Sequence, residues 1–102
     1  MLQIDLPDER IAAFCRKWRI IELAVFGSVL RPDFGPESDI DVLIAFSADA
    51  NWGLFDHVRM EQELSETLQR PVDLVSRRAV ESSHNWVRRN EILRTAEVVY
   101  AA

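Results

Sequence analysis

The chain has 102 residues, 48% hydrophobic and 28% charged, which is enough for one compact domain and too little for two. Twelve basic residues against seventeen acidic ones leave a formal charge of −5, which argues against a protein that holds nucleic acid mainly by neutralising phosphates. Lys17 is the only lysine, and the arginines that make up the rest suit two-pronged recognition of phosphate or carboxylate. We therefore expect residues 1–102 to form a single domain that binds no nucleic acid directly.

The number of cysteines and the hydropathy of the chain indicate in which cell compartment the protein is expected. The single cysteine, Cys15, cannot form an intrachain disulfide, and the first residues lack the basic start and apolar stretch of a secretion signal. The longest clear apolar run, from Val42 to Phe46, has five residues, whereas a membrane helix needs roughly 20. The sequence therefore predicts a cytoplasmic protein with no membrane span.

The first half of the chain reads as one helix followed by two strands. Pro7 and the acids after it favour a helix over 7–18, with apolar residues at helical spacing at Ile11, Phe14, Cys15 and Trp18. Alternating apolar residues from Ile20 predict a strand that ends at Gly27-Ser28. After at most a short helical turn, a turn-rich connection over 31–38 leads into a largely buried strand over 39–46.

The second half alternates helix and strand. The composition of 54–70 favours a helix ended by Pro71; its apolar side is interrupted by Glu61 and Ser65 and consists of Leu54, Val58, Leu64 and Leu68. A short strand over 72–75 follows. We then expect one helix over 80–96 and a closing strand over 98–100; the helix should turn inward Val80, Val87 and Leu93, with Trp86 beside them.

Three carboxylates stand out by position. Asp39 and Asp41 share one face of the second strand, and Asp73 lies near the start of the third. If these strands are adjacent, the three converge at one end of the sheet, where they repel one another unless a cation neutralises them. Hard oxygen ligands of this kind suit Mg²⁺ held together with substrate phosphates. Taken alone, such a pair of aspartates more often caps an element or is solvated.

Gly27-Ser28 supports the hypothesis of a Mg²⁺ and phosphate site. It stands at the end of the preceding strand, and ten residues separate Ser28 from Asp39. Glycine allows the backbone to approach a phosphate closely, and a serine hydroxyl with backbone N–H groups at a following helical turn can bind phosphate oxygens. The dipeptide by itself would merely end a strand. Together the two halves describe one nucleotide site, with phosphates between the turn and the carboxylate-bound cations.

In this order and on these strands, Phe26-Gly27-Ser28, then Ser38-Asp39-Ile40-Asp41, then Val72-Asp73-Leu74-Val75 resemble the minimal nucleotidyltransferases of the DNA polymerase β-like superfamily. Arg31 matches the family's arginine three residues after the serine, and Pro32 replaces the glycine that often follows it. The resemblance covers nearly the whole chain, including its last strand. It implies an α+β fold: a short mixed sheet with helices packed mainly on one face.

The resemblance also implies a reaction, the transfer of a nucleoside monophosphate, AMP in the case of ATP, to an acceptor hydroxyl with release of pyrophosphate. By position, Asp39 and Asp41 would carry two Mg²⁺ ions. Asp73 would bind one of them and help to activate the hydroxyl as a base. Gly27 and Ser28 would hold the β and γ phosphates, with Arg31 nearby.

Small members of this class are commonly encoded beside HEPN-domain RNase toxins, so the resemblance suggests an antitoxin that transfers AMP to a tyrosine of such a toxin and forms a complex with it. Two alternatives remain open. One is a binding antitoxin that neutralises its partner by contact, with a vestigial site. The other is transfer to a small molecule, as in the aminoglycoside-modifying relatives, which need a further domain for the acceptor.

Other conspicuous residues give weaker evidence of function. His57 and His84 have no partner at metal-ligand spacing, and Cys15 lies on an apolar helix face. Residues 77–94 hold five arginines against two glutamates, so one face of the last helix could approach a triphosphate or an acidic partner, although a solvated face is the commoner case. Trp52 is either a partner anchor or a lid packed on the core.

Overall fold

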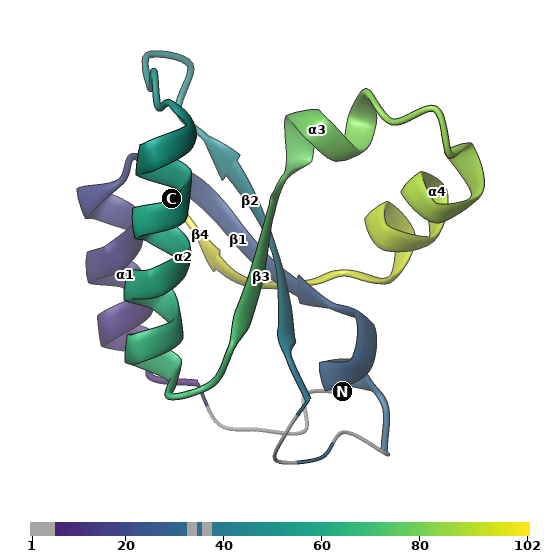
Figure 1. The fold of residues 1–102 in the computed structure, drawn as a ribbon, viewed down its shortest axis with the longest axis horizontal. Coiled ribbons are helices and arrows are strands. Elements are labelled where there is room, and N and C mark those ends of the chain that lie inside the picture. Colours follow the sequence, from purple (N-terminus) through teal and green to yellow (C-terminus); the bar gives the residue numbers. More distant parts are fainter. Residues whose placement is uncertain (1–5, 33–34, 36–37) are drawn as a thin grey trace.

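A mixed sheet forms the centre of the computed structural model, which describes residues 6–32, 35 and 38–102 (Figure 1). Its strand order is β3-β2-β1-β4, and the strands are β1 (Ile20–Phe26), β2 (Ile40–Phe46), β3 (Val72–Ser76) and β4 (Glu97–Ala101). β1 runs antiparallel to both β2 and β4, whereas β3 is parallel to β2. This arrangement confirms the expected α+β fold with a short mixed sheet.

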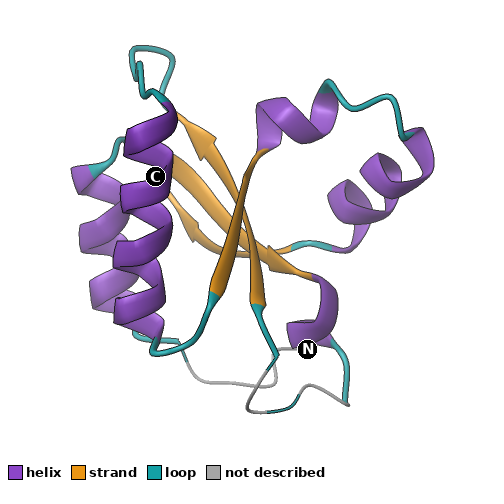
Figure 2. Ribbon diagram, in the orientation of Figure 1, coloured by secondary structure: helices purple, strands orange, loops and turns teal. Residues whose placement is uncertain are grey.

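Helices lie on both faces of this sheet, but they do so unequally (Figure 2). α1 (Asp8–Lys17) and α2 (Leu54–Leu68) cover one face, and α3 (Arg77–Glu81) and α4 (Trp86–Thr95) lie on the other. The larger core cluster joins α1 and α2 to the sheet, and a smaller one joins α3 and α4 to it through Ala24, Phe26 and Leu43. The prediction that the helices pack mainly on one face is therefore confirmed.

The inward face of α2 differs from the predicted one. Leu54 and Val58, which the apolar spacing assigns to the core, are exposed, and the fully buried residues of this helix are Met60 and Leu64. The helix is rotated so that its polar residues reach β3, an edge strand of the sheet. The spacing of apolar residues therefore predicted only part of the buried side of α2.

Polar residues of α2 satisfy the outer edge of β3. Glu61 Oε2 accepts a hydrogen bond from the Leu74 N–H at 2.9 Å, and Ser65 Oγ accepts one from the Val72 N–H at 3.1 Å. Unpaired backbone groups on an edge strand are costly when buried and invite pairing with another chain. The two residues that interrupt the apolar side therefore close the edge beside the strand that carries Asp73.

The single helix predicted over 80–96 is wrong, because residues 82–85 separate α3 from α4. Ser76 Oγ accepts a hydrogen bond from the Ala79 N–H, and Asn85 Oδ1 accepts one from the Arg88 N–H, both at 3.1 Å. Two N-caps start two helices. As a result Val80 and Ile92 are the buried residues, Leu93 is partly buried, and Val87 and Trp86, expected inside or beside the core, are exposed.

The remaining elements agree with the sequence within a few residues. β1 ends at Phe26, and the expected short helical turn is the 3₁₀ helix η1 (Gly27–Leu30). Of the turn-rich connection over 31–38, residues 33–34 and 36–37 lie outside the described residues. In the part of the chain that the structure describes, no helix is both long enough and apolar enough to cross a membrane.

Cys15 provides a test of the larger core. It is fully buried on the inner side of α1, and this burial raises the pKa of its thiol to about 12. Because the thiolate is the reactive form, we expect iodoacetamide at pH 8 to label the native chain at least about a hundredfold more slowly than the urea-unfolded chain. The Cys15→Ser variant gives the background, and native labelling as fast as unfolded labelling would contradict the burial.

The same raised pKa predicts a direction for stability. The unfolded thiol ionises near its ordinary value of 9.0, whereas the native thiol stays neutral until about pH 12. The unfolded state therefore loses its proton first, and the free energy of unfolding falls as the pH rises through this window.

Candidate active site

Two of the predicted carboxylates lie side by side on neighbouring strands. The register pairs Asp41 of β2 with Asp73 of β3, and it pairs Asp41 with Phe26 of β1 on its other side. Their strand neighbours, which alternate with them in direction, belong to the larger core: Ile40, Val42, Val72 and Leu74. Since successive strand residues point to opposite faces, both carboxylates project on the side of α3 and α4.

Asp39 lies just before β2 and is exposed. Ile40, the residue after Asp39, is already paired with the chain that leads into β3, because its N–H donates to the Pro71 carbonyl at 2.9 Å. Alternation along this extended chain puts Asp39 on the same face as Asp41, at the rim of the sheet. Among the described residues, no three His, Cys, Asp or Glu side chains stand close enough to form a ready-made metal site.

Gly27 brings the backbone of the η1 turn against Asp41. Its φ of 74° lies in the left-handed region, which favours glycine. A Cβ at this position would lie 3.2 Å from Asp41 Cγ and would overlap the carboxylate oxygen Oδ2. The glycine is therefore required twice, by its backbone angle and by the carboxylate beside it. The backbone of Ser28 follows in η1, but its side chain lies outside the described residues.

These groups line one cavity of about 390 Å³, within the usual range for small-molecule sites. One part of its wall comes from the end of β1, the η1 turn and β2, and includes Gly27, Arg31 and Asp41. The other part comes from α4 and consists of Arg88, Glu91, Ile92 and Thr95. The structure thus brings three of the six predicted site residues into one cavity with a helix that carries none of them, while Asp39 and Asp73 lie outside its lining.

The arginine-rich segment divides between two places. Arg88 lines the cavity with Asp41, as the sequence allowed for one face of the last helix. Arg77 instead forms ion pairs with Glu22 at 3.0 Å and with Glu81 at 3.5 Å. The surplus of positive charge within an acidic chain was the sequence signal that α4 could contribute to the site, and it could not distinguish Arg88 from the neighbouring arginines.

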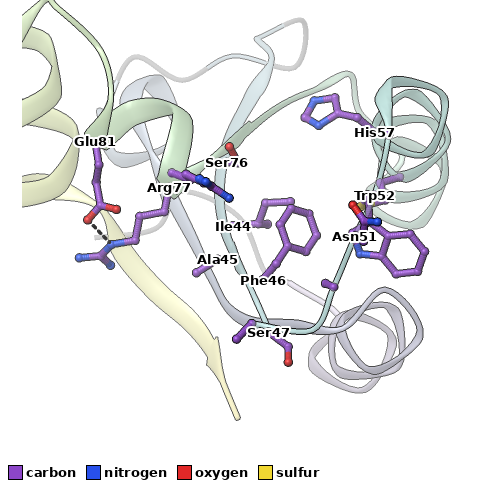
Figure 3. Close-up of a pocket in the computed structure, with 15 residues that line it drawn as sticks. Ile44, Ala45, Phe46, Ser47, Asn51, Trp52, His57, Ser76, Arg77 and Glu81 are labelled. Atoms are coloured by element: carbon purple, nitrogen blue, oxygen red, sulfur yellow. Dashed lines mark hydrogen bonds and ion pairs between the residues drawn. The ribbon is translucent and has the colours of Figure 1, made fainter.

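A second and larger cavity, of about 580 Å³, lies at the carboxyl ends of β2 and β3 (Figure 3). Figure 3 shows Ile44 and Phe46 between Trp52 and His57 on one side and Arg77 on the other. None of the predicted site residues lines it. Cavity volume and chemistry therefore point to opposite ends of the sheet, and the carboxylates favour the smaller cavity.

Trp52 is held on the core beside this second cavity. Its indole N–H donates to the Trp18 carbonyl at 2.8 Å, and the two indole rings pack edge to face with 5.2 Å between their centres. Of the two interpretations of Trp52, the packed lid is the one that the structure supports. His57 is likewise structural, since its Nε2 lies 2.9 Å from the Leu74 carbonyl oxygen and donates to it.

Comparison with protein families gives one match over most of the chain. The family model described as "Nucleotidyltransferase domain" matches residues 8–99. A relative in Methanocaldococcus jannaschii, named as a candidate protein adenylyltransferase, is 25% identical over 68 residues, which are 67% of this chain and 68% of that protein.

Solved structures share the same architecture. A candidate minimal nucleotidyltransferase is 32% identical, with 87% of this chain and 85% of that one covered and a TM-score of 0.66. A chain of a toxin–antitoxin complex with AMP-PNP is 20% identical, with 95% and 75% covered and a TM-score of 0.71. A chain of the Shewanella oneidensis complex of a tri-AMPylated HEPN toxin with an MNT antitoxin is 20% identical, with 93% and 70% covered and a TM-score of 0.62. The last two show likeness of fold.

Proposed function

Since this chain belongs to the nucleotidyltransferase domain family and is a nucleotidyltransferase, we propose that it transfers AMP from ATP to a tyrosine of a HEPN-type RNase toxin and so acts as the antitoxin. The observation that carries the proposal is the Asp41 carboxylate held against the Gly27 turn, with Asp73 paired beside it. The name of the M. jannaschii relative and the AMPylated toxin in the S. oneidensis complex support a protein acceptor.

The donor set fits Mg²⁺. Asp41 and Asp73 offer carboxylate oxygens in register on one face, with Asp39 at the rim, and Mg²⁺ is usually held by one or two carboxylates together with substrate phosphates. We propose that these three residues hold the two ions that the resemblance implies. Bound there, Mg²⁺ would lower the pKa of the attacking hydroxyl and neutralise the leaving pyrophosphate.

The chain's own residues divide the remaining work. In the proposed site, Gly27 and Ser28 hold the β and γ phosphates through the backbone of the turn, and Arg31 adds a positive charge in the same cavity. The acceptor oxygen forms a bond to the α phosphorus while the bond from that phosphorus to the pyrophosphate oxygen breaks. Asp73 takes the hydroxyl proton, and pyrophosphate leaves with the bonding electron pair.

The test uses the purified protein, α-labelled ATP, Mg²⁺ and the protein encoded by the adjacent gene. We expect label in that partner, located on a tyrosine by mass spectrometry, and loss of labelling in EDTA. A partner that stays unlabelled overturns the proposed acceptor. If the Asp39→Asn/Asp41→Asn variant still blocks the partner's RNase activity, the chain neutralises its partner by binding. Label found only in an added aminoglycoside would favour transfer to a small molecule.

We also propose three properties of the whole chain. They are one minimal nucleotidyltransferase domain over residues 1–102, a complex with the toxin in place of nucleic-acid binding, and a cytoplasmic location. Size-exclusion chromatography with light scattering, on the chain alone and with its partner, measures the stoichiometry of the complex.

A further inference from the structure

One side of α4 lines the cavity that holds Asp41. Its lining residues recur at the three- and four-residue spacing of one helix side, and they are Arg88, Glu91, Ile92 and Thr95. Ile92 is only 7% exposed and packs in the smaller core, so it fixes which side of α4 faces the sheet. The packing of the helix therefore leaves Arg88 exposed at the wall of this cavity and of a smaller neighbouring one of about 190 Å³.

Arg88 lines the cavity with no carboxylate partner among the described residues. Its backbone N–H bonds to Asn85 Oδ1, but among the described residues its guanidinium makes no hydrogen bond or ion pair. Arg77 by contrast is paired with two glutamates, and Arg89 lies 3.5 Å from the Glu81 carbonyl oxygen. A guanidinium on a cavity wall with its donors unused is suited to a phosphate group, which it can bind with two parallel hydrogen bonds.

The charges of the lining support an anionic ligand bound together with a metal ion. Arg31 and Arg88 line this cavity together with Asp41 and Glu91, so the two positive and two negative formal charges of the lining cancel. When a divalent cation occupies Asp41, the balance becomes positive, and the two arginines are left to neutralise phosphate oxygens. Without the cation, the negative charges of Asp41 and Glu91 would repel the phosphates of free ATP.

We propose that Arg88 binds phosphate oxygens of the nucleotide from α4, which makes this helix a second wall of the nucleotide site beside the Gly27 turn. The inference rests on the proposed function, because the same cavity has to hold the nucleotide. It assigns a ligand-binding role to a residue outside the strand-borne motif.

Calorimetric titration of the full chain with Mg²⁺ and AMP-PNP tests this role. We expect Arg88→Gln to weaken binding about tenfold to a hundredfold, the usual effect of losing a charge-assisted hydrogen bond, and Arg88→Lys to recover part of the loss. Two matched controls should bind as the parent does. Arg94→Gln removes an exposed arginine from the same helix outside the cavity, and Arg78→Gln removes one from the larger cavity.

The outcomes separate the two claims. If the parent binds Mg²⁺·AMP-PNP and Arg88→Gln binds it equally well, the inference about Arg88 is wrong while the proposed function stands. A parent that binds no nucleotide overturns the proposed function and the inference with it. If Arg88→Gln and Arg88→Lys lose affinity equally, and their melting temperatures fall together, Arg88 supports the fold and does not bind phosphate.

Discussion

The Asp41→Asn chain is expected to fold as the parent does and to transfer nucleotide at least about a thousandfold more slowly. The substitution keeps the size of the side chain and removes only its negative charge. That charge lies against the Gly27 turn and beside Asp73, where a metal ion and the triphosphate would meet. Removing one group that stabilises charge in a transition state commonly costs two to three orders of magnitude, about 3–4 kcal/mol, and a metal ligand costs more.

Single-turnover labelling with α-labelled ATP measures this effect, and urea unfolding verifies that the variant is folded. Asp49→Asn is the matched control, because it makes the same chemical change in an exposed aspartate that pairs with Arg19 at 2.7 Å beyond the far end of β2. The control should keep the parent's rate. A rate in Asp41→Asn within tenfold of the parent would remove Asp41 from the proposed site.

The Gly27→Ala chain is expected to lose both transfer activity and stability. An alanine at φ 74° costs about 1–2 kcal/mol in backbone strain alone. Its Cβ would also collide with the Asp41 carboxylate, which has to turn away from the cavity to make room. The substitution therefore displaces the group that Asp41→Asn neutralises, and we expect a similar fall in rate.

A double-mutant cycle separates the two costs. In the Asp41→Ala background no carboxylate stands in the way, so Gly27→Ala should then cost only the backbone strain. Urea unfolding of the four chains gives the difference, and equal costs in both backgrounds would show that Asp41 does not contact the turn. Gly53→Ala serves as the activity control, because its Cβ would meet only Asp56 Oδ2 at an ordinary 3.9 Å.

The parts of the fold that local pattern determines could be predicted from the sequence. The apolar run of β2 and the two-residue spacing of the aspartates were enough to place Asp39 and Asp41 on one face. The parallel pairing of β2 with β3 confirms that Asp73 lies next to Asp41. The position of the two aspartates on one strand depends on neighbours within a few residues, whereas the place of Asp73 beside Asp41 depended on the two strands being adjacent.

The features that depend on distant partners were not predictable in the same way. Glu61 and Ser65 looked like interruptions of an apolar face until β3 supplied the backbone N–H groups that they accept. Asn85 is a preferred N-cap residue, but its capping role depends on the break at 82–85, so the inward residues of 80–96 were assigned along one continuous helix. The cavity wall on α4 belongs to the second of these two helices, which is anchored by Ile92 in the smaller core.

The pairing of β2 has a consequence for how the site is protected from misfolding. A slip of one residue in its register would turn Asp41 into the larger core and bring Val42 out to the opposite face. A carboxylate in that apolar interior, without a partner, would cost several kcal/mol, and the buried valine would be lost from it as well. The apolar face of the sheet therefore raises the free energy of every misaligned β2. Folding itself places the Asp41 carboxylate on the correct face before any ligand binds.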